Sequence, residues 1–373
     1  MQKNGPEVGK IGKRNLTMQI GSRFIGDGQP CFVVAELSCN HFQSYARAEE
    51  LVRLAKEAGA DAVKLQTFTP DTITMDSHNP LFLVGGQGNP DSWKKKSLYE
   101  LYQTAYMPWE WQPKLKKLAD ELGIILFSSA FDTTAVDFLE KMEVPCYKIA
   151  SYEATDWTIL TRVAKTGKPV IISVGYTTLD EVAESVEVLK KNGAREIAIL
   201  HCVTGYAGDP DLSAMNLRTI RDISDHFGVV AGFSDNNAGI EVPVLAVEAG
   251  ASIVEKHFTI RRADGGLDER FSIEPEEFAE MVKRIRRGEC ALGRAHYGPA
   301  NDLERENIRF RRSLFAVRDV KKGERFTPEN VRSIRPADGL PTKWYPKVIG
   351  ATASRDIEAG TPLQLDLIIE QKK

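Results

Sequence analysis

The segment CFVVAELSCNHFQSYARAEELVRLAKEAGADAVKL, residues 31–65, holds two apolar runs separated by an amphipathic stretch. The runs are Cys31–Glu36 and Ala62–Leu65. Between them, Ser44 is a good cap for the start of a helix, and Gly59 is a good residue to end it. A strand, a helix and a second strand in this order form a βαβ unit, so the segment predicts two neighbouring parallel strands.

The same alternation repeats to about residue 287, and each apolar run is followed by a helical stretch. Eight strands are expected, at Cys31–Glu36, Ala62–Leu65, Ile124–Phe127, Cys146–Ile149, Val170–Ser173, Ile197–Leu200, Val229–Phe233 and Ile253–Glu255. Eight such units in about 250 residues have the size of a closed (β/α)8 TIM barrel. An open doubly wound sheet is the alternative, but no GxGxxG follows the first run, which favours the barrel within the α/β class.

One connection is much longer than the others. It runs from Phe68 to Tyr106 and contains Gly85-Gly86, Pro90 and the start of an aromatic segment, Leu98–Trp111. Loops of this length in a compact domain usually have a function. We therefore expect this excursion to act at the site, for example as a lid.

A second, smaller domain is expected after the barrel. The segment from Arg318 to Gly323, RDVKKG, is echoed by Arg355 to Gly360, RDIEAG, which indicates a β-rich pseudo-duplication with a thin core. The stretch Ala291–Arg312 before it is polar and is expected to be irregular. The predicted parts are an extension with leading strands at 1–30, the barrel at 31–295, a linker at 296–312 and the small domain at 313–373.

Composition excludes several classes of function. The net charge of −3 argues against a nucleic-acid-binding protein. No apolar run reaches the roughly 18 residues of a membrane span, and residues 1–23 lack the apolar core of a signal peptide. The five cysteines are scattered and lack CxxC spacing, as in reduced proteins. A cytoplasmic protein is expected.

Polar side chains gather where the expected strands end, which is where TIM barrels carry their working residues. Lys64 and Lys148 end apolar strands, and lysine is almost never buried without a partner. Either an anion binds in the barrel mouth, or Glu36 pairs with one of the lysines. Hydroxyl groups add donors around the same rim, at Ser129, Ser151, Ser173, Thr204 and Ser234. Lysines with hydroxyls are typical of a site for a small polyanion such as a phosphorylated carboxylate.

A metal site is a weaker expectation. Strand alternation places Ser234 and Asn236 on one face, and Glu255 and His257 on one face. Since neighbouring strands lie about 4.8 Å apart, His257 and Asn236 could share one ion. An imidazole and a neutral amide oxygen make a weak two-point site, which suits Mn²⁺ or Mg²⁺.

Ordered motifs now indicate a family. They are AELSCNH from Ala35 to His41, VKLQT from Val63 to Thr67, YKIAS from Tyr147 to Ser151, GFSD from Gly232 to Asp235, and EKHFT from Glu255 to Thr259. This set resembles the sialic acid synthase family, and the tail, with Ile334–Pro336 and Gly339–Pro341, resembles its antifreeze-like (SAF) domain. Segments 97–102, 108–111 and 262–268 resemble its pseudaminic acid synthase branch.

The resemblance implies a transferase that joins phosphoenolpyruvate to an amino-sugar aldehyde, releases phosphate and forms a nonulosonic acid. The acceptor expected first is 2,4-diacetamido-2,4,6-trideoxy-L-altrose. A divalent ion, Mn²⁺ first and Mg²⁺ or Co²⁺ next, would bind His257 and Asn236. Catalytic roles fall to Glu36, His257 and Lys148. The donor would contact Lys64, Ser129, Lys148, Ser151, Ser173, Thr204, Ser234 and Arg335, the last from the partner subunit of a domain-swapped homodimer. The sugar would contact Asn40, Gln66, Tyr206, Asp235 and Asp268.

The chain departs from the family pattern at the predicted site. Asn236 stands where the family has a metal-binding histidine, and Val174 and Tyr176 stand where Thr and Met are usual. A weakened or inactive sugar-binding paralogue is therefore one alternative. Synthases of N-acetylneuraminate or legionaminate, or of a sugar 6-phosphate, are others. A Schiff-base aldolase with Lys148 or Lys64 as nucleophile is the remaining one.

Overall fold

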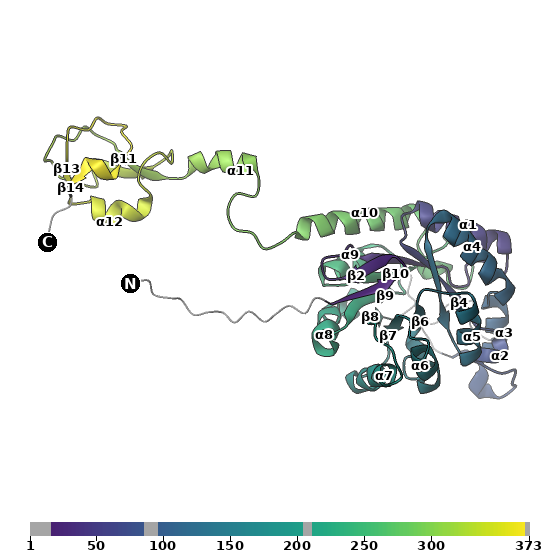
Figure 1. The fold of residues 1–373 in the computed structure, drawn as a ribbon. Coiled ribbons are helices and arrows are strands. Elements are labelled where there is room, and N and C mark those ends of the chain that lie inside the picture. Colours follow the sequence, from purple (N-terminus) through teal and green to yellow (C-terminus); the bar gives the residue numbers. More distant parts are fainter. Residues whose placement is uncertain (1–15, 86–95, 204–210, 370–373) are drawn as a thin grey trace. The chain divides into compact units, whose positions relative to one another are not determined.

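Eight parallel strands close into a barrel in the computed structural model, which describes residues 16–85, 96–203 and 211–369 (Figure 1). The strand order is β10-β3-β4-β5-β6-β7-β8-β9. The strands are β3 (Phe32–Glu36), β4 (Ala62–Thr67), β5 (Ile125–Ala130), β6 (Tyr147–Ile149), β7 (Val170–Ser173), β8 (Ile197–Val203), β9 (Val230–Asp235) and β10 (Ile253–His257). The predicted TIM barrel is confirmed, and the open sheet is wrong.

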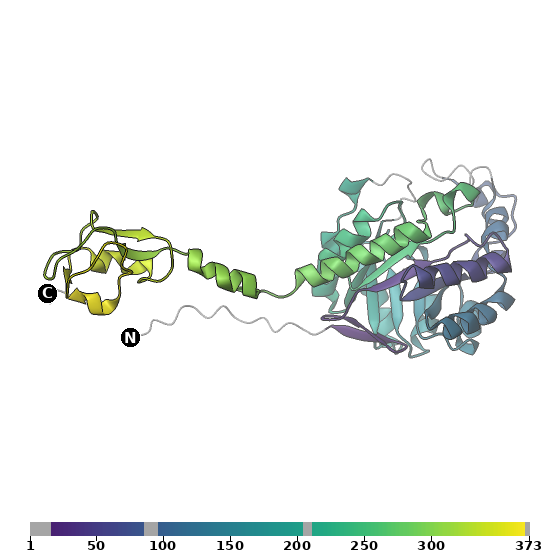
Figure 2. The same cartoon turned by 90° about the horizontal axis from the view of Figure 1, so that it is seen from above.

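Helices surround the barrel and connect its strands (Figures 1 and 2). They are α1 (Tyr45–Glu57), α2 (Pro70–Ile73), α3 (Leu98–Ala105), α4 (Gln112–Leu122), α5 (Thr133–Lys141), α6 (Trp157–Ala164), α7 (Leu179–Lys191), α8 (Arg218–Phe227), α9 (Glu241–Glu248) and α10 (Pro275–Leu292). As predicted, Ser44 caps α1, since its hydroxyl accepts from Arg47 N at 3.4 Å. Gly59, just beyond α1, has φ +89°, which glycine adopts without strain.

Apolar side chains fill the barrel at the end where its strands begin. Phe32 and Ile253 open β3 and β10 and belong to one buried cluster with Phe127. An antiparallel hairpin of β1 (Thr17–Ile20) and β2 (Arg23–Gly26) packs its apolar residues into the same cluster. This end of the barrel is a packed core, so a ligand is expected at the opposite mouth.

A second compact unit, 294–373, has its own apolar core. Its elements are α11 (Asp302–Asn307), β11 (Ser313–Ala316), β12 (Val331–Ile334), α12 (Tyr345–Val348), β13 (Thr352–Ala353) and β14 (Ile368–Ile369). The two repeat segments pair reciprocally. The Asp319 carboxylate accepts from Ala359 N, and the Asp356 carboxylate accepts from Lys322 N, both at 2.8 Å.

Part of the predicted irregular stretch is helical, so that prediction is wrong for α11. The reason is a side-chain cap, because Asn301 Oδ1 accepts from Glu304 N at 2.9 Å. The first unit ends at residue 293, two residues before the predicted end of the barrel. None of the helices in the described ranges has the length and apolarity of a membrane span.

Candidate active site

Strand register brings the predicted charged residues together at the barrel mouth. Glu36 of β3 lies beside Lys64 of β4 on one side and beside His257 of β10 on the other. Glu255 of β10 lies beside Ser234 of β9. Because β-strand side chains alternate, these groups face the barrel interior in one layer or the next.

Two lysines and two glutamates form a buried ion cluster. Lys64 Nζ lies 2.6 Å from Glu36 Oε2 and 3.6 Å from Glu255 Oε1. Lys148 Nζ lies 3.3 Å from the same oxygen of Glu255. All four residues are at most 5% exposed. The alternative that Glu36 pairs with a lysine is therefore confirmed, and the lysines need no bound anion to be neutralised.

The cluster gives its two carboxyl groups different pKa values. Burial raises the pKa of Glu36 above its ordinary value, and attraction to Lys64 offsets this in part. Burial also disfavours the charged form of Glu255, but attraction to Lys148 and Lys64 outweighs it and lowers the pKa of Glu255. Burial lowers the pKa of Lys148. Glu36 is thus suited to carry a proton, while Glu255 stays ionised.

A cavity of about 480 Å³ opens above this cluster. Ser151, Ser173 and Ser234 line it together with both lysines. The buried Ser173 hydroxyl has no hydrogen-bond partner within the described part of the chain. Ser129 supports the site from behind, since its hydroxyl accepts from Lys64 Nζ at 3.0 Å and it does not line the cavity.

Two predicted sugar contacts do not line the cavity. Asp235 is one position out of phase with Ser234, so it faces away from the barrel interior and pairs with Lys256 Nζ at 2.8 Å. Asn40 is fully buried and donates to Phe258 O at 2.8 Å, which ties two loops together. The prediction of sugar contact is wrong for both residues in this structure.

Three further predicted residues are not placed at the cavity. Thr204 and Tyr206 lie outside the described residues. Arg335 lies in the second compact unit, just after β12.

His257 and Asn236 both line the cavity, as the metal prediction requires. Burial lowers the pKa of His257 to about 3, so its imidazole is neutral and able to bind a metal. The buried Nδ1 of His257 lacks a hydrogen-bond partner among the residues described. Asn236 Nδ2 donates to Cys202 Sγ at 3.3 Å, which directs the amide oxygen to the other side. In the ranges 16–85, 96–203 and 211–369, no three His, Cys, Asp or Glu residues cluster as a metal site. An ion held by this pair would have two protein ligands and open positions.

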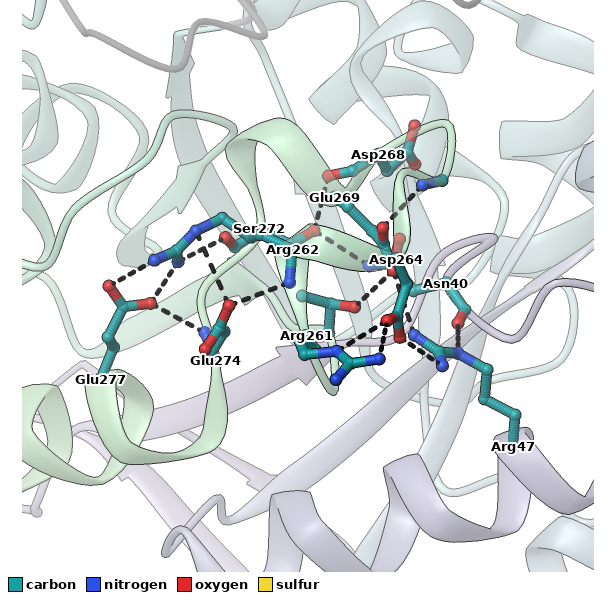
Figure 3. A network of polar contacts seen from close by, with 12 residues as sticks. Asn40, Arg47, Arg261, Arg262, Asp264, Asp268, Glu269, Ser272, Glu274 and Glu277 are labelled. Carbon is teal, nitrogen blue, oxygen red and sulfur yellow. Dashed lines mark hydrogen bonds and ion pairs between the residues drawn. The ribbon is translucent and has the colours of Figure 1, made fainter.

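The loop between β10 and α10 brings Asp268 to the cavity, and a polar network holds this loop (Figure 3). The Asp268 carboxylate accepts from Ser38 Oγ. Arg47 of α1 lies 2.7 Å from Asp264 Oδ2 and 3.0 Å from Glu269 Oε1. Glu269 is 1% exposed and its other oxygen accepts from Gly266 N at 2.6 Å.

An apolar wall forms the remaining side of the cavity. The long excursion supplies Phe68, Ile73, Val84, Leu98, Leu101, Tyr102 and Ala105, and the turn after β5 adds Phe131. The rings of Phe68 and Tyr102 meet edge to face at 5.5 Å, and those of Phe68 and Phe131 at 5.2 Å. The prediction that the excursion acts at the site gains support from these contacts. Residues 86–95 of it lie outside the described ranges.

Several polar residues of the cavity were not among the predicted site residues, and they include Ser38, Cys39, Glu153, Cys202 and Glu255. Glu255 was detectable, because it shares a strand face with His257. Ser38, Glu153 and Cys202 lie in turns or beside other polar residues, where no periodicity marks them. Burial raises the pKa of Glu153 to about 7, and its Oε2 is buried without a hydrogen-bond partner in the described structure.

Comparisons with known proteins agree with the barrel and with the small domain in the tail. The NeuB family profile matches residues 51–297, and the SAF domain profile matches residues 311–369. The chain belongs to the NeuB family. It is 39% identical to pseudaminic acid synthase of Campylobacter jejuni, over 93% of this chain and 98% of that protein. It is 38% identical to pseudaminic acid synthase of Helicobacter pylori, over 91% and 98%.

A solved structure supports the NeuB-family fold along nearly the whole chain. The spore coat polysaccharide biosynthesis protein SpsE of Bacillus subtilis matches with a TM-score of 0.64 and 32% identity, over 95% of this chain and 100% of that one. The resemblance to the sialic acid synthase family and its pseudaminic acid synthase branch is confirmed, as are the SAF domain and the expectation of an enzyme.

Proposed function

We propose that this NeuB-family enzyme condenses phosphoenolpyruvate with an amino-sugar aldehyde to form a nonulosonic acid and phosphate. The observation that carries the proposal is the convergence of Lys64, Lys148 and His257 on one cavity. Had these side chains pointed into separate regions, no single site for a doubly anionic donor would exist.

Phosphoenolpyruvate, the donor, would bind at the end of the cavity that is lined by lysines and hydroxyl groups. Lys64, Lys148 and the hydroxyls of Ser151, Ser173 and Ser234 would hold the phosphate and carboxylate. The unpartnered Ser173 hydroxyl supports this, because a buried donor without a partner is costly unless a ligand satisfies it. Thr204 is proposed as a further donor contact, although it lies outside the described residues.

The sugar acceptor would bind at the end of the cavity that is lined by Gln66 and Asp268, next to the apolar wall. Polar groups next to an apolar wall favour a sugar that carries methyl and acetamido groups over one that carries a phosphate. This supports 2,4-diacetamido-2,4,6-trideoxy-L-altrose, with pseudaminic acid as product. The relatives named above support the same choice. Tyr206 stays a predicted contact.

A divalent ion would be held by His257 and Asn236, with Mn²⁺ proposed first and Mg²⁺ or Co²⁺ as alternatives. When bound, such an ion stabilises negative charge on the aldehyde oxygen. An amide oxygen is a weaker ligand than imidazole, so weak affinity is expected. This explanation is preferred to the inactive paralogue because the lysine cluster and His257 are all in place.

The chain's own residues account for the remaining chemistry. C3 of phosphoenolpyruvate forms a bond to the aldehyde carbon, and the donor C2 becomes an oxocarbenium carbon. Water adds there, with Glu36 placed to orient it or move its proton. The resulting tetrahedral carbon expels phosphate by breaking its C–O bond. Lys64 and Lys148 hold the leaving anion.

Assembly and location stay predictions. We propose a cytoplasmic, domain-swapped homodimer in which Arg335 reaches the barrel of the partner subunit. Light scattering on the purified protein tests the dimer, and a monomer at working concentration would contradict it.

The decisive test of the proposed function is phosphate release from phosphoenolpyruvate across a panel of acceptors and metals, with product mass. The panel contains 2,4-diacetamido-2,4,6-trideoxy-L-altrose, its legionaminate-type isomer, N-acetylmannosamine and N-acetylmannosamine 6-phosphate. We expect release and the nonulosonate mass with the first acceptor. Absence of phosphate with every acceptor and ion would overturn the proposal.

A Schiff-base aldolase is the second candidate, since burial lowers the pKa of Lys148 as it does in lysine nucleophiles. Its contact with Glu255 argues for a charged lysine instead. Borohydride trapping with pyruvate distinguishes the two. A covalent adduct on Lys148 would favour the aldolase, and inhibition by EDTA without an adduct would favour the synthase.

A further inference from the structure

We infer that Ser38 is a positioning residue that joins the acceptor side of the site to Glu36. The inference rests on the proposed function, because Glu36, Gln66 and Asp268 have their roles from it. Ser38 was not among the residues expected from the sequence. Its hydroxyl lies between two groups that are expected to touch the sugar.

The hydroxyl of Ser38 is a junction in an unbroken hydrogen-bond chain. It donates to the Asp268 carboxylate and accepts from Gln66 Nε2 at 3.1 Å. The same Nε2 donates to Glu36 Oε1 at 2.7 Å. One small side chain therefore fixes both Gln66 and Asp268, which come from different elements, relative to Glu36.

The backbone of Ser38 supports a role for its side chain. Its φ of +45° lies in the left-handed region, where glycine is the least strained residue. A serine there is strained, and such residues persist where the surrounding structure holds them, often at functional sites. Ser38 is 3% exposed and lines the cavity, so its hydroxyl acts at the site and not at the surface.

The loop that carries Asp268 is held from its other side, which lets Ser38 act on a defined partner. Ser272 Oγ donates to Asp268 O at 2.7 Å and accepts from Asn40 Nδ2 at 2.9 Å. These contacts fix the backbone of Asp268 but not its carboxylate (Figure 3). Ser38 Oγ donates to the carboxylate, and the Cys39 thiol, a weaker donor, also contacts it, so losing the Ser38 hydroxyl loosens this group.

Two substitutions separate the hydroxyl from the backbone. Ser38→Ala removes the hydroxyl and keeps the strain, while Ser38→Gly removes both. Thr166→Ala is the matched control, because the Thr166 hydroxyl donates to Val163 O at 2.7 Å just past the C-terminal end of α6, far along the chain from the site. The control is expected to leave both KM values as they are.

The expected result is a split between the two substrates. In Ser38→Ala and Ser38→Gly the acceptor KM rises about tenfold, as for loss of one charge-assisted hydrogen bond, and the donor KM stays within twofold. The double variant Ser38→Ala with Asp268→Asn is expected to raise the acceptor KM by less than the product of the two single effects, because the two side chains act as one unit. Equal rises in both KM values, an unchanged acceptor KM, or recovery of the acceptor KM in Ser38→Gly would each overturn the inference.

A second readout does not depend on turnover. Amide hydrogen exchange of full-length Ser38→Ala is expected to speed up in residues 264–272 and to stay unchanged in the barrel strands. Unchanged exchange in that loop would overturn the inference. If the wild-type enzyme releases no phosphate with any acceptor, the proposed function fails while this measurement still decides the role of Ser38.

Discussion

Glu255 contacts both site lysines, so under the proposed function it would compete with the donor for them. A doubly anionic ligand must share Lys64 and Lys148 with this carboxylate, or draw them away from it. This arrangement keeps two buried cations neutralised in the empty enzyme. We expect it also to lower the affinity that the lysines would otherwise have for phosphoenolpyruvate.

Glu255→Gln is expected to destabilise the empty enzyme and to tighten donor binding. The stability loss is of the order of 3 kcal/mol, because two buried lysines lose their shared carboxylate. Phosphoenolpyruvate should then raise the melting temperature more than it does in the wild type. Thermal unfolding with and without donor measures both effects. The control Glu187→Gln breaks the exposed i,i+4 pair with Lys191 on α7 (2.6 Å) and should cost less than about 1 kcal/mol.

Glu153 makes stability depend on pH near neutrality. Its pKa is about 7 in the folded protein and near 4.5 when unfolded, so the folded state binds more protons between these values. Stability therefore falls as pH rises from about 4.5 to 7. Glu153→Gln should flatten this slope and stabilise the protein at pH 8 by roughly 1 kcal/mol, since the side chain keeps partial contact with solvent. Urea unfolding of both proteins from pH 5 to 8 measures the free energy of unfolding at each pH. The same pH dependence in Glu153→Gln and in the wild type would contradict the prediction.

At the scale of elements, α1 controls the loop between β10 and α10 through Arg47. Its guanidinium reaches Asp264 and Glu269 and also donates to Asn40 O at 2.8 Å. It lies over the Phe42 ring at 4.3 Å. A planar, forked cation is needed for this set of contacts.

Arg47→Lys is therefore expected to loosen the loop although the charge is kept. A lysine cannot contact both carboxylates and the ring at once. Hydrogen exchange in residues 261–272 should accelerate at least tenfold, and the acceptor KM should rise. Arg221→Lys is the matched control, since Arg221 pairs with Asp225 on the exposed face of α8. Equal exchange in both variants would show that the guanidinium geometry is unimportant.

The strands were predictable from the sequence because parallel barrel strands are buried on both faces and read as apolar runs. Residues at the barrel mouth could be predicted from their position at the C-terminal ends of the strands. Lys64, Lys148 and His257 are examples. The predicted sugar contact of Asp235 does not hold because the prediction followed its polarity. Strand alternation turns its side chain away from the barrel interior, since it is next to the inward-facing Ser234. Ser38 could not be found, since its role depends on a positive φ and on a partner 230 residues away.

For the whole molecule, the two compact units raise the question of what the second unit contributes. A chain ending at residue 293 keeps the complete barrel and its core. It should therefore fold, with an unchanged far-ultraviolet spectrum per barrel. If Arg335 completes the partner's donor site, its turnover should fall at least tenfold, and Arg335→Ala in the full chain should reproduce the loss. Full activity of the shortened chain would contradict the domain-swapped dimer.

The proposed synthase requires the lysine cluster as its donor site, and calorimetric titration of phosphoenolpyruvate tests that requirement most directly. Lys148→Met keeps the contact of Glu255 with Lys64, so the variant should fold. We expect its donor Kd to rise about a hundredfold, roughly 3 kcal/mol, while Lys168→Met at the barrel's opposite end keeps the wild-type Kd. Equal donor affinity in wild type and Lys148→Met would contradict the lysine cluster as the donor site.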